Sequence, residues 1–350
     1  MKFINKIKLK EKRIIKNKNL KRFLIFVTIF FIGIFFERFD VKIKFYKFNK
    51  ELVNIISNRI FSISNNLDEI VIDLKHKNYQ KILKERDLSI KKGRANEDLH
   101  NWVPANISFN DEYFKVKIKL KGAHSDHWAH PKKWSFKIKL LNDKSINGFK
   151  RFSVQQPITR DFLYEWLFMK VLKNEGLIYH RNDFLKIQIN GDNLGIYYLE
   201  ELYSKQLIEN NGRREGPIIS LDKNQWIEEV SNINNLGANF FEDSFWRAKI
   251  KPLQFKENQI GTTQEIYLKE AISLFENFRN KKLRLEKVFN LEQLAKLMAI
   301  KAVFGSPEFD WRDIKFYYNP ITSLLEPIAR EIDFYDIINK SPWWIDDDYL

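Results

Sequence analysis

Three aspartates in the last fifty residues of the chain are candidates for chemistry with a metal ion. Asp310 and Asp313 lie three residues apart in EFDWRDIKFYYNP, residues 308–320. Two like charges repel by about 1 kcal/mol at 4 Å even in water, so such a pair favours a nearby cation. A predicted hairpin after Asp313 brings Asp333 back toward it. Three carboxylates gathered in this way would suit Mg²⁺ or Mn²⁺, with substrate phosphates completing the shell.

The elements that must position these aspartates have clear sequence signals. NLEQLAKLMAIKAVFG begins with Asn290 and Gln293, which is typical of a capping box, and ends at Gly305. IKFYY, NPIT and LLEPIAREI predict the hairpin, and Asp333 follows it. A protein kinase orders its catalytic loop and its metal-binding Asp in the same way. Aspartates in loops also serve turn chemistry, and the pattern alone leaves that interpretation open.

Lysines alternate with apolar residues along two predicted strands. FKVKIKLKG, Phe114–Gly122, follows this pattern strictly, and WSFKIKL (134–140) repeats it. Period-two alternation buries one face of a strand and leaves the lysines on the other. On the first strand these are Lys115, Lys117, Lys119 and Lys121. Such a face is either simply solvated or carries one or two lysines that bind phosphate.

Further patterns complete a sheet with helices beside it. DEIVIDLK (68–75) alternates like a strand, and YQKILKERDLSIKKGR (79–94) is typical of a basic helix. FLKIQIN and NLGIYYLEE, residues 184–190 and 194–201, predict a hairpin around an Asn190-Gly191 turn. After residue 202 the pattern changes to helices and loops, and 203–260 reads as polar and irregular.

A helix is predicted between these strands by TRDFLYEWLFMKVLKNEG. Thr159 would be its N-cap, and Gly176 would end it. We expect its inward face to consist of Leu163, Trp166, Leu167, the Lys170 stem and Val171.

The net charge of +15 in 350 residues is concentrated at the N-terminus. Residues 1–22 hold ten Lys and Arg against one Glu, which leaves +6 for residues 37–350 because 23–36 are uncharged. A nucleic-acid binder would carry the charge on its folded part, so we expect no nucleic-acid partner. Cysteine is absent, which excludes disulfides and thiolate metal sites.

An apolar run follows this basic leader. FLIFVTIFFIGIFF, Phe23–Phe36, is shorter than the roughly 20 residues of a straight membrane span, but flanking basic side chains can snorkel. A cleaved signal peptide is the alternative, although ERFD after Phe36 lacks the small-residue cleavage pattern. We expect an uncleaved single-pass anchor at 23–37 with a helical stalk at 38–66. The basic leader, 1–22, would stay in the cytoplasm and the folded domain would lie outside it.

Several motifs together resemble the spore-coat-protein-H (CotH) kinase-like family. They are VKIKLKGAHSDHW, KKWSFKIKL, NGFKRFSVQQPITRDFLYEWLF, NGDNLGIYYLEELYSKQLIE, NNGRREGPII and DWRDIKFYYNP…LEPI. The resemblance runs in consistent order from about residue 68 to about residue 333. It implies an atypical, protein-kinase-like phosphotransferase that uses ATP and a divalent cation, Mg²⁺ or Mn²⁺.

The resemblance implies a role for each of the three aspartates. Asp310 resembles the catalytic-loop aspartate that orients the substrate hydroxyl or accepts its proton. Asp313 stands where the family's DWRN places a metal-binding asparagine, so an oxygen ligand is kept and a charge is added. Asp333 is similar to the metal-binding aspartate after the second hairpin. The usual EPI-x-x-D spacing is stretched here to EPIAREID, which makes Glu331 a rival ligand.

The resemblance also implies cofactor-binding residues. Lys137 looks like the strand lysine that holds phosphates, with Lys139 as an alternative on the same side and Lys121 as a second contributor. Glu165 would pair with that lysine. Glu200 and Glu201 would lie at a hinge where the adenine edge meets backbone groups.

The implied fold is α+β with two lobes, a sheet-rich N-lobe at 67–201 and a helical C-lobe at 202–350. The implied activity is transfer of the γ-phosphoryl group of ATP to a hydroxyl of a protein substrate, on Ser or Thr. Asp313 and the stretched spacing keep an alternative open, in which the chain is an inactive kinase-like scaffold for surface binding or assembly. The chain ends soon after Asp333, so a truncated C-lobe is also considered.

Overall fold

The structure is a computed structural model, and it describes residues 67–93, 95, 100–222, 245–305 and 313–332. The predicted leader, membrane anchor and stalk lie outside these residues, as do Asp310 and Asp333. Among the residues that are described, no helix has both the length and the apolar character needed to cross a membrane.

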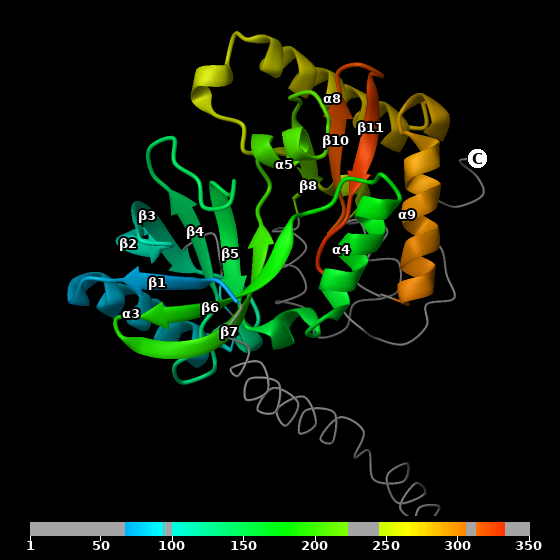
Figure 1. The fold of residues 1–350 in the computed structure, drawn as a ribbon. Helices are drawn as coiled ribbons and strands as arrows, with labels where there is room; N and C mark the ends of the chain where they lie inside the picture. The colour runs from blue at the N-terminus through cyan, green and yellow to red at the C-terminus, as the bar shows by residue number, and fades with distance from the viewer. Residues whose placement is uncertain (1–66, 94, 96–99, 223–244, 306–312, 333–350) are drawn as a thin grey trace, which may run out of the picture. The chain divides into compact units, whose positions relative to one another are not determined.

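The described chain is a mixed α+β protein whose first sheet closes on itself as a seven-stranded barrel (Figure 1). The strand order is β1-β2-β3-β4-β5-β7-β6, and a parallel β1–β6 pair closes the ring while the other neighbours are antiparallel. The strands are β1 (Glu69–Asp73), β2 (Val103–Phe109), β3 (Glu112–Leu120), β4 (Phe136–Leu140), β5 (Arg151–Gln155), β6 (Asn182–Ile189) and β7 (Asp192–Glu201).

Alternation along the strands builds the interior of the barrel. In β3 the residues Val116, Ile118 and Leu120 are fully buried, and Ile138 of β4 and Phe152 of β5 join them in one apolar core. Helix α3 (His76–Lys92) packs on β2 and β3. The predicted β6–β7 hairpin is confirmed, and Asn190 and Gly191 have the positive φ that its tight turn requires.

A second sheet has the order β11-β10-β8-β9. The β10–β11 hairpin was predicted, but β8 and β9 were not, because the sequence around them reads as irregular and helical. The new strands pair with the hairpin through β8, which lies antiparallel to β10. The strands are β8 (Ile218–Leu221), β9 (Ile250–Leu253), β10 (Lys315–Asn319) and β11 (Leu324–Ile328).

Helices α4 (Tyr164–Asn174), α8 (Thr263–Arg279) and α9 (Leu291–Phe304) share the apolar core of this second sheet, and α5 (Lys205–Asn210) packs in a smaller adjoining cluster. Helices α4 and α9 lie side by side (Figure 1). The start and end of α9 are confirmed, since Asn290 Oδ1 accepts a hydrogen bond from the Gln293 N–H and Gly305 has a left-handed conformation.

The predicted start and inner face of α4 are wrong. Thr159 lies in the short 3₁₀ helix Pro157–Arg160, and the N-cap of α4 is Leu163, without a side-chain cap. Leu163 and Leu167 are 54% and 49% exposed. Apolar residues occur all round this helix, so periodicity could not select a face, and packing in the second core selected another. The buried residues are Glu165, Phe168, Met169 and Leu172.

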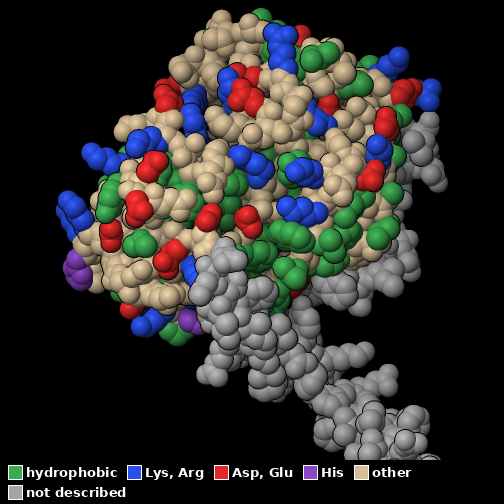
Figure 2. Space-filling model, viewed as in Figure 1, with side chains coloured by type: hydrophobic (Ala, Val, Ile, Leu, Met, Phe, Trp, Pro, Cys, Tyr) green, Lys and Arg blue, Asp and Glu red, His purple; other side chains and the backbone are tan. Residues whose placement is uncertain are grey.

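Charged side chains of both signs are interspersed on the face of the molecule seen in Figure 2. Basic groups on this face are accompanied by acidic ones and do not form one continuous patch. Other charged groups, among them Lys121, Arg160 and Glu200, are instead buried, and burial makes their interactions stronger than those at the surface.

Candidate active site

The alternating lysines of β3 and β4 lie on the outer face of the barrel, opposite the apolar side chains of the interior. The strand register places Lys119 beside Lys137, and Lys137 beside Ser153 of β5. Ser153 in turn lies beside Glu200 of β7. A row of polar residues therefore crosses four strands on one face of the sheet. We call this the lysine-bearing face.

The two ends of the lysine-bearing face differ in solvent exposure. At one end, which we call the open end, are Lys115, Lys117 and Lys139, all exposed. At the other, which we call the covered end, Lys119 and Lys121 are 8% and 2% exposed and Lys137 is half-buried. At the open end, contact with water is enough to stabilise the lysine charges. At the covered end there is less water, and burial disfavours a lysine charge unless a partner compensates it.

Glu200 is the centre of the covered end. Its Oε2 atom accepts hydrogen bonds from Lys121 Nζ at 3.1 Å, Gln155 Nε2 at 2.8 Å and Ser153 Oγ at 3.2 Å. The guanidinium groups of Arg160 and Arg330 lie 3.5 Å and 3.3 Å from the carboxylate. One fully buried carboxylate thus faces three cations.

The pKa values of these groups follow from that imbalance. Burial alone would raise the pKa of Glu200, but the charges of Arg330, Lys121 and Arg160 outweigh it and hold the pKa well below its usual range. Burial lowers the pKa of Lys121 to about 8, helped by Arg160 and only partly opposed by Glu200. The two shifts are compatible, because Glu200 has three opposite charges around it while Lys121 shares its one anion with two arginines. We therefore take Glu200 as ionised.

Glu165 binds the backbone of the chain just before Asp333. Its Oε1 accepts the N–H of Glu331 at 3.0 Å, and its Oε2 accepts the N–H of Ile332 at 2.9 Å. Burial raises the pKa of this carboxyl to about 7, although Arg160, 3.9 Å away, opposes the shift. The predicted pairing of Glu165 with Lys137 is not confirmed and stays a prediction. The ion pair that the structure gives Glu165 is with Arg160.

Arg330 and Glu331 connect the end of the β10–β11 hairpin to the covered end. Glu331 Oε1 lies 2.7 Å from Arg330 Nη2 and 2.9 Å from Arg160 Nη2. Arg330 also stacks over the Tyr203 ring at 5.0 Å. Burial raises the pKa of the Tyr203 hydroxyl, and among the smaller causes is the negative charge of Asp313. The chain on both sides of the hairpin therefore approaches one charged cluster.

Glu201 has a separate internal partner. Its carboxylate lies 2.6 Å from Arg181 Nη2, and its backbone carbonyl contacts His180 Nδ1 at 2.7 Å. Its N–H donates to the Arg181 carbonyl. Glu200 and Glu201 both direct their side chains to internal cations, and contact of this hinge with an adenine edge stays a prediction.

Of the three aspartates predicted to lie at a metal site, the structure describes Asp313. Asp313 is half-buried, whereas Asp310 and Asp333 lie outside the described residues. Within the described ranges, no three His, Asp or Glu side chains are grouped closely enough to hold a metal ion. The proposed ligand set therefore remains a sequence prediction.

Sequence reasoning missed Arg160, Arg330, Gln155 and His180. Arg160 and Arg330 converge on Glu200 from positions 170 residues apart, and a single arginine outside the strands and longer helices carries no periodic signal. Each does lie within or beside a quoted motif, QQPITRD and EPIAREI. His180 is fully buried, with its Nε2 atom unpartnered among the described residues.

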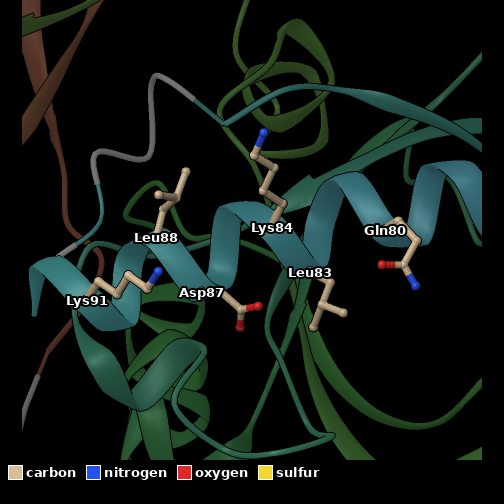
Figure 3. Close-up of a pocket in the computed structure, with 6 residues that line it drawn as sticks. All are labelled: Gln80, Leu83, Lys84, Asp87, Leu88 and Lys91. Atoms are coloured by element: carbon tan, nitrogen blue, oxygen red, sulfur yellow. The ribbon is translucent and has the colours of Figure 1, made fainter.

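A shallow surface hollow of about 280 Å³ lies elsewhere, along α3 (Figure 3). All its lining residues come from this one helix, so it is a groove between neighbouring side chains. It includes none of the predicted site residues. These lining residues are Gln80, Leu83, Lys84, Asp87, Leu88 and Lys91.

Comparison with protein families gives one match. The model of the CotH kinase protein family matches residues 118–323, more than half of the chain. The matched region begins within β3 and ends in the turn between β10 and β11, so it includes Asp310 and Asp313 but stops before Asp333. No curated protein matches the chain.

Proposed function

The chain belongs to the CotH kinase protein family, and on that premise we propose that it transfers the γ-phosphoryl group of ATP to a hydroxyl of a protein substrate, on Ser or Thr. The reaction needs a divalent cation, Mg²⁺ or Mn²⁺. In this proposal the barrel and the α4, α8 and α9 region act as the two lobes of a kinase-like fold. Phosphoryl transfer of this kind depends mainly on positioning and charge stabilisation.

The observation that carries the proposal is the meeting of the lysine-bearing face with the segment before Asp333. Arg330 and Glu331 make ion pairs with Glu200 and Arg160 at the covered end. This supports the proposal, because Lys121 joins the same ion cluster and Lys137 lies beside Ser153, which also binds Glu200. A kinase site needs phosphate-binding and metal-binding residues close together. A strand whose lysines are simply solvated would not need a metal-binding segment beside it.

The lysines of the covered end suit a polyphosphate. Lys137 is half-buried and lies between Lys119 and Ser153 in the row of polar residues. In the proposal it holds phosphate oxygens, with Lys119 beside it. Lys121 acts differently, since its ammonium already binds Gln155 and Glu200 and so fixes the end of β3. Ammonium groups in a desolvated setting neutralise phosphate charge more effectively than exposed ones.

Asp313 and Glu331 are the described oxygen donors among the candidate ligands of a hard cation. The carboxylate of Asp313 is a suitable ligand type, and Glu331 already neutralises two arginines. This favours Asp333 over Glu331 as the second ligand. A bound Mg²⁺ or Mn²⁺ would neutralise charge on the phosphates. Asp310 would orient the substrate hydroxyl or take up its proton.

Phosphoryl transfer from radiolabelled ATP to the protein itself and to a generic Ser/Thr substrate tests the proposal. The wild type should label in the presence of Mn²⁺ or Mg²⁺, and Asp310→Asn should remain folded but lose about a thousandfold in rate or more. Asp111→Asn, in an exposed turn, is the matched control and should keep full activity. Equal labelling by Asp310→Asn and the wild type would remove Asp310 from the mechanism.

The second candidate function is an inactive scaffold for surface binding or assembly. Asp313 in place of the family's asparagine favours it. A thermal shift with ATP and Mn²⁺ separates the two functions when combined with the transfer assay. Binding without transfer in the purified wild type would select the scaffold.

We also propose that Phe23–Phe36 anchors the chain in a membrane and that the folded domain lies outside the cytoplasm. The basic leader and the uncharged apolar run support this orientation. Protease added outside intact cells should digest the folded domain. Protection of the domain in intact cells, with digestion only after lysis, would reverse the orientation.

A further inference from the structure

We propose that the first turn of α4 is a positioning element that fixes the end of α9, which precedes Asp310 in the sequence, relative to the segment after β11, which precedes Asp333. Tyr164 holds the first and Glu165 the second. This inference rests on the proposed function, because it concerns the alignment of the same site. Neither residue needs to touch ATP or substrate. Tyr164 acts through the carbonyl of Phe304, six residues before Asp310, and Glu165 acts through the two N–H groups just before Asp333.

Tyr164 holds the end of α9. Its hydroxyl donates a hydrogen bond to the backbone carbonyl of Phe304, the last residue of that helix. The two rings also pack edge to face at 5.3 Å between centroids. A second edge contact at 5.3 Å joins Phe304 to Phe168, one turn further along α4. Asp310 follows this anchored end by six residues in the sequence.

Glu165 holds the segment after β11. Its two carboxylate oxygens each accept one backbone N–H, from Glu331 and from Ile332, so the carboxylate grips two successive amides. Glu331 has a φ of 66°, and a positive φ helps to turn successive N–H groups toward one anion. Asp333 is the next residue in the sequence. The carboxylate is fully buried, so water does not compete for these amides.

The rest of α4 provides a rigid base for these two contacts. Phe168, Met169 and Leu172 are buried in the core that α4 shares with α9. Adjacent residues on a helix point about 100° apart, which lets Tyr164 and Glu165 reach two different segments from one turn. A shift of this turn would move the end of α9 and the segment after β11 together, and a misplacement of about 1 Å in a catalytic group can cost about a hundredfold in rate.

Two substitutions separate the two contacts. Glu165→Gln keeps the size of the side chain but replaces one acceptor oxygen by an amide that cannot accept, so one of the two N–H groups loses its partner. Tyr164→Phe removes only the hydroxyl. The matched controls are Glu175→Gln, which is exposed on the C-terminal end of the same helix, and Tyr113→Phe, which is largely exposed.

We expect Glu165→Gln to lower kcat for phosphoryl transfer by about 10- to 100-fold, with the KM for ATP changed by less than about threefold. Tyr164→Phe should lower kcat by a smaller factor. The controls should behave as the wild type. In hydrogen exchange, the Glu331 and Ile332 amides should exchange about tenfold faster in Glu165→Gln, while core strand amides stay protected. A merely structural role would accelerate exchange throughout the molecule and lower the melting temperature without this local signature.

The outcomes separate this inference from the proposed function. If Glu165→Gln leaves both the exchange of these amides and kcat unchanged, the positioning role is overturned. Faster local exchange with an unchanged kcat also overturns it. If the wild type transfers no phosphate, the proposed function fails and Mn²⁺ affinity replaces kcat as the readout. Binding at least about tenfold weaker in Glu165→Gln then supports the positioning role, and equal affinity overturns it.

Discussion

The open end and the covered end of the lysine-bearing face belong to the same pair of strands, but their lysines differ in solvent exposure. Lys117 and Lys139 are neighbours across β3 and β4 at the open end, where both are exposed. Lys119 and Lys137 are neighbours two residue pairs further along the same ladder, where Lys119 is buried and Lys137 is half-buried. Residue type and strand period are the same at both ends.

The difference comes from what other parts of the chain bring to the covered end. Arg160 and Arg330 reach Glu200 from outside the barrel strands, and Lys121 reaches it from the end of β3. Burial then converts these contacts from weak surface pairs into strongly interacting ones. The period of a strand thus sets which face a lysine occupies, and distant chain segments decide whether that lysine faces solvent or is buried.

The largest expected effect is at Glu200. Glu200→Gln leaves Lys121, Arg160 and Arg330 without their shared anion, and removal of one partner from a buried ion cluster costs about 3–5 kcal/mol in the free energy of unfolding. Chemical denaturation measures it. Lys117→Met, at the open end, should change the same quantity by less than about 0.5 kcal/mol. If Glu200→Gln and Lys117→Met both changed the free energy of unfolding by the same small amount, the two ends would contribute equally to stability.

His180 makes the free energy of unfolding depend on pH, which gives a second test of the buried cluster. Burial, together with the charge of Arg330, lowers the pKa of His180 to about 4 from 6.5. A depressed pKa contributes stability that is present above pH 6.5 and lost as pH falls through about 4. The wild type should therefore lose up to about 3 kcal/mol over this range relative to His180→Asn, whose amide can replace Nδ1 in the contact with Glu201.

Denaturation curves of the two proteins at matched pH values give this difference directly. Comparing the pair also cancels the opposite contribution of Glu165, whose raised pKa of about 7 favours the folded state at low pH. Parallel pH profiles for the wild type and His180→Asn would contradict the depressed pKa.

Gly122 begins the loop that follows the covered end of β3. A Cβ atom at this position would lie 2.0 Å from Cδ2 of His127, and its φ of 93° is already unfavourable for other residues. Gly122→Ala should lower the melting temperature, by an amount equivalent to about 2–4 kcal/mol. Gly93→Ala has a similar positive φ but nothing within 4 Å of the added Cβ, so it should cost only about 1–2 kcal/mol. A Gly122→Ala no less stable than Gly93→Ala would show that the loop is loosely packed there.

The smallest expected effect is at Lys139. This lysine lies at the open end and is exposed, so Lys139→Met should change the free energy of unfolding by less than about 0.5 kcal/mol. A loss above about 1 kcal/mol would show that the open end is stabilised by its lysines and would weaken the contrast between the two ends.

Local patterns predicted the parts of the fold that depend on local rules. The lysine alternation of β3 and β4, the Asn190-Gly191 turn and the caps of α9 at Asn290 and Gly305 follow from period, turn chemistry and capping. Each of these rules acts over a few residues, which is the range that a single sequence displays directly.

The missed features depend on contacts between distant residues. Strand β8 pairs with β10 almost a hundred residues later, and no local pattern marks that partner. Glu165 is a charged residue on a buried face, which reverses the usual expectation for a helix. Its role becomes visible only when the backbone amides at Glu331 and Ile332 are brought to it.

The central claim is that the covered end, and not the open end, binds the phosphates of ATP. The direct test is the affinity for ATP with Mn²⁺ of Lys137→Met and Lys139→Met, two substitutions on one strand and one face, measured by calorimetry on the purified full chain. We predict that Lys137→Met weakens binding by about tenfold or more, while Lys139→Met stays within about twofold of the wild type. Equal affinities for the two variants, or a larger loss in Lys139→Met, would contradict the account.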